Sequence, residues 1–597
     1  MLLQKICLPK NDTTIQNMYV RLNRNNVKII GEEDMLVSEN CYQAIRFNTY
    51  FNSFSRKKWQ KYTTLNNLHL SLTFEGRARI VLTKMELCGN DLSEYVLSSH
   101  LVNNDTIQTC EFEYPSYSGE DCVAFHIYPL SEVFSLYVKG GYTTKVDESI
   151  LPEINLSLAI CTYKREDYVT KNIKMLENEV FQNRDSILHN HLKVYISDNG
   201  NSLSDYALDS DSVKLFLNKN SGGSGGFSRA VIEAMQDQSY NPTNIILMDD
   251  DIYFDVDALE RNYTFLKLLK PEYEECMIGG AMFRTDHRFI QHAAGETNTL
   301  NGIIFNKSGL NMNSPLDVVK NEFEDNFNYL GWWYCCITKE VFEKKGLSLP
   351  LFVQYDDIEF SMRCYDIPKI TLNGICCWHL PFDKKWSSFK NYYTIRNRTI
   401  VNCIRFDGMS KKRFIKELKH LVFRGMFQYS FNEVNLILLA AEHFMKGMPW
   451  LIQQDPSELN KKVIQMSDKL IETDKLPIPF NYNALRTAQN FNPKESRPLL
   501  RLITLNGWLL PANRTMIVTL EDPPTTYFYR AKEVIKYDIN SGKGFVVYRD
   551  KNAAKEIINR WIKLKKEINA HFDERVEEYR RMVPEVTSKE FWLDFLK

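Results

Sequence analysis

The feature that most constrains the fold is a change of hydrophobic periodicity along the chain. Between residues 151 and 406, short apolar runs alternate with patterns typical of helices, and the runs occupy residues 156–160, 193–197, 214–217 and 245–248. Such alternation predicts a mostly parallel sheet that is covered by helices. The 597 residues exceed what one hydrophobic core usually supports, so we expect further domains on either side.

Different patterns flank this α/β region. Before about residue 145, short alternating segments such as residues 68–74 and 78–82 are separated by turns and predict an all-β sandwich or barrel. After residue 411, long helical patterns dominate, as in residues 553–582. We therefore predict an all-β domain over residues 1–148, an α/β domain over residues 149–406 and a mainly helical domain over residues 407–597.

Three consecutive aspartates, Asp249, Asp250 and Asp251, follow the apolar run at residues 245–248. In open α/β sheets, ligands bind beyond the carboxyl ends of the strands. Neighbouring carboxylates repel one another, and a hard divalent cation relieves that repulsion. The triplet therefore predicts a metal site at this edge of the sheet, with a solvated acidic turn as the alternative.

Three further motifs of the same region could bind a nucleotide. Arg165 follows the first strand and could grip a diphosphate, although an arginine is more often a plain surface residue. Asn199, in the turn Asp198-Asn199-Gly200, could bind a nucleobase or ribose. Asn220 precedes the run Gly222-Gly223-Ser224-Gly225-Gly226, which would either bring backbone amides close to a ligand or form a flexible turn before a helix that begins near Phe227.

Aromatic and acidic residues that suit a sugar site occur further along the chain. Trp332 and Trp333 could form a stacking floor for a sugar or pack in the core. Asp356 and Asp357 open a helical pattern, so the first could cap a helix and the second could act as a general base. His379 ends another apolar strand, where a neutral imidazole suits a divalent metal, although a lone histidine is more often structural.

Charge and motif spacing exclude several other classes. The formal net charge is −1, which gives no general attraction to nucleic acid. The glycine run lacks the spacing of a dinucleotide-binding motif, and no Gly-Lys-Ser or Gly-Lys-Thr follows it, so neither a Rossmann cofactor nor a P-loop is supported. No apolar stretch approaches the ~20 residues that span a bilayer, and residues 1–11 contain no secretory signal. We expect a soluble or peripheral protein.

A basic amphipathic segment lies between Arg405 and Arg424. It carries seven basic residues against two acidic ones, and its apolar residues recur at helical spacing. Such a helix can lie on anionic lipid. The alternative is an ordinary helix that packs one face on the rest of the protein.

The ordered set of motifs resembles the glycosyltransferase family 2 enzymes with the GT-A fold, and within them the bacterial galactofuranosyltransferases of the galactan-polymerising kind. The resemblance covers roughly the first two thirds of the chain. The residues that carry it are, in order, Thr49-Tyr50-Phe51-Asn52-Ser53-Phe54, Cys161-Thr162-Tyr163-Lys164-Arg165, Asp198-Asn199-Gly200, Gly222-Gly223-Ser224-Gly225-Gly226-Phe227, Asp249-Asp250-Asp251, Trp332-Trp333, Tyr355-Asp356-Asp357, Trp378-His379 and Arg396-Asn397-Arg398.

The resemblance implies an inverting transfer of galactofuranose from UDP-galactofuranose to a hydroxyl of a glycan or glycolipid acceptor. It implies that Asp357 is the catalytic base. The remaining implied roles are metal binding of Mn²⁺ or Mg²⁺ by Asp249, Asp251 and His379, UDP binding by Arg165, Asn199, Asn220 and Asp250, and sugar or acceptor binding by Trp332, Trp333 and Asp356. The chain carries Tyr355 where the polymerising relatives commonly have a tryptophan, so chain elongation is left open.

The resemblance also implies that the all-β domain binds the acceptor and that the helical domain assembles subunits and touches the membrane. It predicts a homo-oligomer that contacts the inner face of the cell membrane. The thirteen cysteines show no Cys-x-x-Cys spacing and predict reduced thiols in a cytoplasmic protein, and the net charge predicts no nucleic-acid partner. Three other functions stay open. They are a GT-A glycosyltransferase that uses another nucleotide sugar, a metal-dependent phosphoesterase that uses the same carboxylates, and a noncatalytic glycan-binding module.

Overall fold

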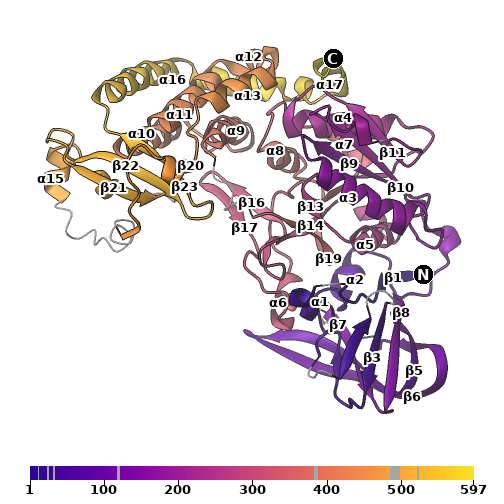
Figure 1. Cartoon of the computed structure of the whole chain (residues 1–597). Helices are drawn as coiled ribbons and strands as arrows, with labels where there is room; N and C mark the ends of the chain where they lie inside the picture. Colours follow the sequence, from indigo (N-terminus) through magenta and orange to yellow (C-terminus); the bar gives the residue numbers. More distant parts are fainter. Residues whose placement is uncertain are drawn as a thin grey trace.

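The chain folds into three consecutive regions, each with its own β-sheet (Figure 1). The structure is a computed structural model that describes every residue except 11, 23–25, 31–33, 117–121, 207, 382–386, 484–497 and 521–522. An eight-stranded sheet comes first, a nine-stranded sheet with flanking helices second, and a group of helices with a four-stranded sheet last. No helix within the described residues has both the length and the apolar character needed to cross a membrane.

The first sheet is built around one long strand, β5 (His69–Cys88). β5 pairs antiparallel with β6 (Asp91–Glu113) along most of its length, with β8 (Val133–Thr143) near its beginning and with β7 (Cys122–Pro129) near its end. The remaining strands are β1 (Leu2–Lys5), β2 (Val27–Ile30), β3 (Met35–Glu39) and β4 (Ile45–Arg46). The predicted β-rich amino-terminal region is confirmed, whereas its closure as a barrel or a two-sheet sandwich stays a prediction.

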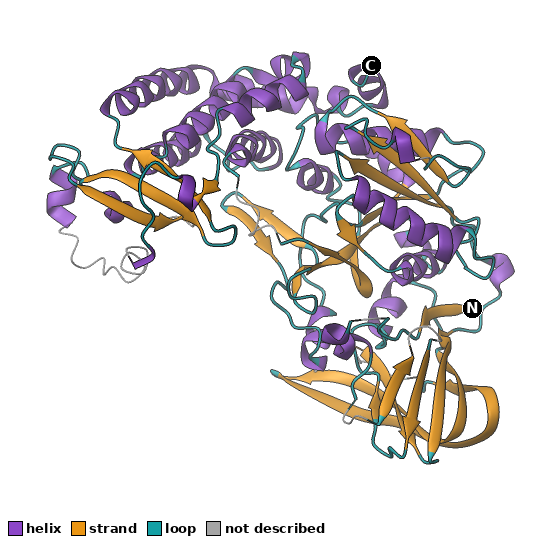
Figure 2. Ribbon diagram, viewed as in Figure 1, coloured by secondary structure: helices purple, strands orange, loops and turns teal. Residues whose placement is uncertain are grey.

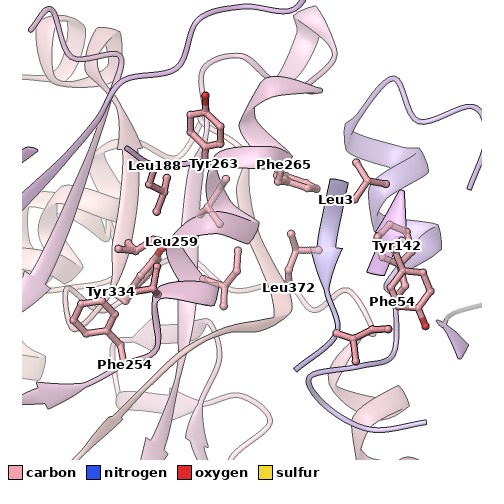
Figure 3. Close-up of a cluster of buried hydrophobic side chains, with 14 of the residues drawn as sticks. Leu3, Phe54, Tyr142, Leu188, Phe254, Leu259, Tyr263, Phe265, Tyr334 and Leu372 are labelled. Carbon is pink, nitrogen blue, oxygen red and sulfur yellow. The ribbon is translucent and has the colours of Figure 1, made fainter. Parts of the chain in front are cut away.

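The amino-terminal sheet and the central region share one hydrophobic core. Leu3 of β1 is buried in the same apolar cluster as Phe265 of α5 (Val256–Lys267) and Leu372 of β19 (Lys369–His379) (Figure 3). Lys5 Nζ also lies 2.6 Å from a carboxylate oxygen of Glu260 on α5. The β-rich region is therefore fixed to the central region by core packing as well as by the chain connection.

The central sheet contains the predicted parallel strands. The strands β11 (Val213–Leu217), β10 (Leu192–Asp198), β9 (Leu156–Thr162) and β12 (Asn244–Asp249) lie side by side in this order, and each neighbouring pair is parallel. All four predicted strands are therefore confirmed. The sheet continues from β12 through β18 (Cys335–Thr338), β14 (Met277–Arg284), β19 and β13 (Ile252–Tyr253). β18 runs antiparallel to β12, so the sheet is mixed.

Helices dominate the carboxyl-terminal region, as predicted, but a sheet accompanies them that the prediction omitted. α9 (Phe389–Arg405), α11 (Phe431–Met445) and α16 (Lys551–Val586) pack together, and α10 (Lys411–Phe427) packs on α11 and α16. The sheet lies beside these helices (Figure 2) and consists of β20 (Ile471–Glu472), β23 (Lys543–Tyr548), β22 (Ala531–Asp538) and β21 (Arg514–Thr519). The domain boundaries at residues 148/149 and 406/407 stay predictions.

The final described helix, α17 (Lys589–Phe595), returns to the central region. It packs against α4 (Gly222–Gln236), and its Trp592 is fully buried. Trp592 Nε1 donates to the carbonyl of Ser348 at 3.0 Å. The amide of Leu347 donates to the carbonyl of Thr587 at 2.7 Å. The residues after α16 therefore support the segment that leads into α8 (Asp356–Arg363).

Candidate active site

A cavity of about 720 Å³, which we call the central cavity, opens at the carboxyl end of β12. Asp249 lines it from the end of β12, and Asp356 and Asp357 line it from the first turn of α8. Trp332 and Trp333, which precede β18, complete this part of the wall. Five predicted site residues that are far apart in the sequence therefore meet at one cavity.

Asp251 joins two further predicted residues next to Asp249. His379 Nε2 lies 3.0 Å from Asp251 Oδ1, and Arg165 Nη2 lies 3.5 Å from Asp251 Oδ2. The contact with His379 follows from the sheet, because β13 pairs antiparallel with β19 and places Ile252 opposite His379. The structure thus brings the three side chains together, while their roles toward a metal and UDP stay predictions.

The aspartate triplet has the chemistry of a cation site. Burial, followed by the charges of Asp251 and Asp250, raises the pKa of Asp249 well above its usual range. Burial raises the pKa of Asp250 to about 6, although Thr162 Oγ1 donates to Asp250 Oδ2 at 2.7 Å. Crowded carboxylates with an imidazole are donors that suit Mn²⁺ or Mg²⁺. In the described residues, however, no group of three or more His, Cys, Asp or Glu side chains is already arranged to hold a metal.

The two aspartates of α8 differ in their surroundings. Asp356 is buried, and Ser224 Oγ donates to its Oδ2 at 3.3 Å. Asp357 is partly exposed, and its Oδ1 accepts from the amide of Ile358 at 2.8 Å. Burial, followed by the charge of Asp356, raises the pKa of Asp357 above its usual range. A carboxylate with raised proton affinity at a cavity wall is suited to accept a proton from a bound hydroxyl.

The alternative in which Asp356 caps the helix is wrong. Asp356 is the first residue of α8, and the capping position belongs to Tyr355, whose side chain makes no capping hydrogen bond. Tyr355 has φ 70° and ψ 0°, which is left-handed backbone. The helix start is therefore fixed by contacts from outside the helix rather than by a local capping side chain.

The adjacent tryptophans have different partners. Trp333 Nε1 donates to the carbonyl of Gly280 at 2.9 Å, which anchors its ring in the core. Trp332 contacts Phe227 and Phe360 edge to face, and its indole N–H has no acceptor among the described residues. Both tryptophans are buried, so each packs in the core and also lines the central cavity. Trp332 therefore differs from Trp333 in having a buried indole N–H without an acceptor among the described residues.

Asn199 and Asn220, two of the residues predicted to bind UDP, contact the glycine run. Asn199 is buried, donates to the carbonyl of Gly222 at 2.9 Å and accepts from Asn218 at 2.7 Å. Asn220 Oδ1 accepts from the amide of Gly222 at 3.2 Å. Neither asparagine lines the central cavity, so a direct contact of either with UDP stays a prediction.

The glycine run forms the first turn of α4, which begins at Gly222 rather than near Phe227. The prediction of the helix start and the flexible-turn alternative are therefore wrong. Gly222 has φ +67°, and a Cβ atom there would lie 2.1 Å from the carbonyl oxygen of Phe352. The amide of Ser224 donates to the same oxygen at 3.2 Å. Close packing against this segment overrides the low helix propensity of glycine. Gly223 also lines the central cavity.

Sequence reasoning missed several residues of the central cavity. Ile303 and Phe305 reach it from the hairpin of β16 (Glu296–Thr299) and β17 (Gly302–Phe305). Glu296 on that hairpin is fully buried, and burial followed by the charge of Asp357 raises its pKa well above its usual range. Other lining residues are Tyr329, Gln354, Asn391 and Thr394. No local pattern marks them, because they reach the cavity through tertiary packing.

The chain is similar to two galactofuranosyltransferases named GlfT2. The protein from Mycolicibacterium smegmatis is 24% identical over 431 residues, which cover 68% of this chain and 64% of that protein. The protein from Mycobacterium tuberculosis is 23% identical over 590 residues, which cover 92% of this chain and 89% of that protein. The first match thus spans slightly less than two thirds of its relative. Residues 3–122 match the family described as galactofuranosyltransferase 2 N-terminal.

Two solved glycosyl-transferring enzymes are distantly similar to this chain. The mannosyltransferase PcManGT from Pyrobaculum calidifontis, in complex with GDP-Man and Mn²⁺, is 12% identical with a TM-score of 0.28, covering 53% of this chain and 81% of that chain. Glucosyl-3-phosphoglycerate synthase from Mycobacterium tuberculosis is 10% identical with a TM-score of 0.24, covering 42% and 79%. Likenesses at this level do not assign a role to any residue of this chain.

Proposed function

We propose that this chain, which is similar to the galactofuranosyltransferases, is a glycosyltransferase that transfers galactofuranose from UDP-galactofuranose to a hydroxyl of a lipid-linked cell-surface glycan. The observation that carries the proposal is the meeting of Asp249, Asp357 and Trp332 at the central cavity, next to the contacts of Asp251 with Arg165 and His379. An inverting, metal-assisted sugar transfer needs groups of these kinds.

Asp357 is the proposed base. An acceptor hydroxyl in the central cavity attacks the anomeric carbon and loses its proton to the Asp357 carboxylate. The bond between the anomeric carbon and the diphosphate breaks on the opposite face, UDP leaves with the bonding electrons, and the configuration inverts. Trp332 would orient the sugar through its ring, with Trp333 and Asp356 beside it.

Asp249, Asp251 and His379 are the proposed ligands of Mn²⁺ or Mg²⁺. When bound, the cation would offset the negative charge that develops on the leaving diphosphate. Arg165 would bind a phosphate oxygen on the same side, because its guanidinium already lies against Asp251. The remaining proposed UDP contacts are Asp250, Asn199 and Asn220.

A donor screen tests the proposed function. We expect UDP release from UDP-galactofuranose in the presence of a galactose-terminated lipid acceptor, and none from UDP-galactopyranose, which is matched in nucleotide and composition and differs in ring size. Chelation with EDTA should abolish turnover and added Mn²⁺ should restore it, because the leaving diphosphate needs its charge offset. The readout is UDP formed per enzyme per minute.

Each other outcome of the screen has a definite meaning. Turnover with a different nucleotide sugar would retain the transferase and discard the furanose assignment. Release of UMP or phosphate without acceptor would favour the phosphoesterase. Glycan binding with no metal-dependent UDP binding would favour a noncatalytic module.

A peripheral contact with anionic membrane is also proposed. α10 buries Phe414, Leu418 and Val422 against its neighbouring helices, which agrees with the ordinary packing alternative for that face. Its opposite face contributes Lys416, Lys419, His420 and Arg424 to a cavity of about 830 Å³, which Arg501 of α15 (Pro498–Ile503) also lines. On α15, Leu499 and Leu502 are each 74% exposed. Basic residues beside exposed leucines suit an anionic lipid surface.

Charge reversal on α10 should weaken this contact. The double variant Lys416→Glu with Lys419→Glu is expected to lower partitioning onto phosphatidylglycerol vesicles at least about tenfold, because each basic residue near such a surface contributes about 1 kcal/mol. Vesicle flotation measures the bound fraction. Lys563→Glu with Lys566→Glu on α16 is the control, since these lysines are also exposed and have the same spacing. Equal flotation of both double variants would contradict the proposal.

Assembly and location belong to the same proposal. We propose a homo-oligomer assembled through the helical region, in the cytoplasm at the inner face of the membrane, where a lipid-linked acceptor would be reached. Flotation with cross-linking of the wild-type chain on vesicles would report both features together.

A further inference from the structure

Residues 349–355, which we call the base loop, lead directly into α8 and Asp357. Three of its residues have positive φ although none is glycine: Phe352 at 76°, Gln354 at 65° and Tyr355 at 70°. Residues other than glycine rarely have positive φ angles. A loop with three such residues keeps its shape only where its surroundings fix it.

One buried side chain on α9 contacts three carbonyl groups of the base loop. Asn397 Nδ2 lies 3.1 Å from the carbonyl oxygen of Leu351, 2.8 Å from that of Val353 and 3.0 Å from that of Gln354. Arg396 Nε donates to Asn397 Oδ1 at 2.9 Å, which keeps the NH₂ group turned toward the loop. Asn397 is fully buried, so water does not compete for these hydrogen bonds.

The carbonyl that Asn397 does not reach is held from the other side. The amide of Ser224, in the first turn of α4, donates to the carbonyl of Phe352. Arg396 Nη2 adds a second donor to the carbonyl of Leu351 at 2.7 Å, and Thr394 Oγ1 donates to Gln354 Oε1 at 2.8 Å. The four consecutive carbonyls of residues 351–354 therefore all accept hydrogen bonds from α4 or α9.

We infer that Asn397 is a positioning residue for the proposed base. It holds the base loop in its left-handed conformation, and the loop in turn sets where α8 begins and where Asp357 meets the central cavity. Asn397 does not line that cavity, so it acts through the loop and not on the substrate. This inference rests on the proposed role of Asp357. Misplacing a reacting group by 1 Å can cost about 10²-fold in rate.

Asn397→Leu tests the inference, because leucine has a similar volume and no donor. We expect kcat to fall about 100-fold, with the KM for the donor and the affinity for UDP in Mn²⁺ unchanged. Hydrogen exchange of amides in residues 351–359 should become faster. Asn402→Leu is the matched control: Asn402 is a buried asparagine of the same helix whose side-chain amide has no partner among the described residues. It should change neither kcat nor exchange in the loop.

A second variant covers the case in which Asn397→Leu does not fold. Asn397→Gln keeps the NH₂ group but displaces it by one methylene, so the same readouts apply with a smaller expected loss of kcat. Normal kcat despite faster loop exchange would overturn the inference, as would equal kcat losses at Asn397 and Asn402 or a parallel loss of UDP affinity.

The experiment separates this inference from the proposed function. A wild-type chain that transfers no sugar from any donor would fail the proposed function. Loop exchange would still show whether Asn397 holds the base loop, and unchanged exchange in Asn397→Leu would overturn that role in either case.

Discussion

Asp357→Ala is expected to lower kcat for sugar transfer by about 10²- to 10⁴-fold, the usual contribution of a general base. UDP affinity in Mn²⁺ should stay unchanged, because Asp357 is the second residue of α8, whereas the proposed metal ligands lie on β12, β13 and β19 or beside them. Single-turnover rates and calorimetric UDP titration measure the two quantities separately. Asp366→Ala is the control, since Asp366 is exposed beyond the end of α8 and pairs with Lys345 at 2.7 Å.

The pH profile gives an independent check on Asp357. A base acts only when it is unprotonated, and burial with the charge of Asp356 raises the pKa of Asp357. As the pH is lowered, kcat/KM should therefore begin to fall at pH values at which an ordinary aspartate, with a pKa of about 3.9, is still charged. Asp356→Asn removes the neighbouring charge and should move this acid limb to lower pH. Turnover of Asp357→Ala at the wild-type rate would remove Asp357 from the mechanism.

Asp251→Ala is expected to lower metal-dependent UDP affinity and kcat/KM by about 10³-fold. A cation that stabilises a leaving diphosphate supplies several kcal/mol, and each 1.36 kcal/mol is a factor of ten. Asp251 also contacts His379, a proposed metal ligand, and Arg165, a proposed phosphate ligand. Its loss would remove the carboxylate that both side chains share. Direct Mn²⁺ titration without nucleotide, together with UDP titration with and without Mn²⁺, measures the effect.

Two controls bound the interpretation of Asp251→Ala. Asp167→Ala removes an exposed carboxylate of α3 (Glu166–Leu176), two residues from Arg165, and should leave both affinities unchanged. Asp251→Asn keeps the shape of the side chain and should still lose most of the Mn²⁺ affinity, because an amide oxygen carries no charge. Wild-type Mn²⁺ affinity in Asp251→Ala would place the metal elsewhere.

The central strands could be predicted from the sequence because buried parallel strands appear as short apolar runs. The four runs that end at or near residues 160, 197, 217 and 248 became β9, β10, β11 and β12. The position of Asp249 at a strand end followed from the same pattern. The meeting of Asp249 with Asp357 could not be predicted in this way, because the two residues are 108 positions apart and only the tertiary fold brings them to one cavity.

The missed features depend on contacts between distant segments. The strands β21, β22 and β23 lie among longer helical patterns in the sequence. Their backbone hydrogen bonds form only when the three segments come together in the fold. The glycine run has the composition of a turn, yet it becomes helical because the carbonyl of Phe352 approaches Gly222. The sequence likewise could not distinguish Trp332 from Trp333, since the difference is the carbonyl of Gly280.

The proposed base and the proposed metal ligands are attached to different parts of the molecule. Asp249 ends a strand of the central sheet, whereas three of the four hydrogen-bonded carbonyls of the base loop are held by α9, which packs with α11 and α16. Directed evolution could therefore treat the two halves of the site separately. Libraries confined to α9 and the helices packed against it would vary turnover and acceptor choice. The strand that carries the aspartates would keep its sequence, and with it the recognition of the nucleotide.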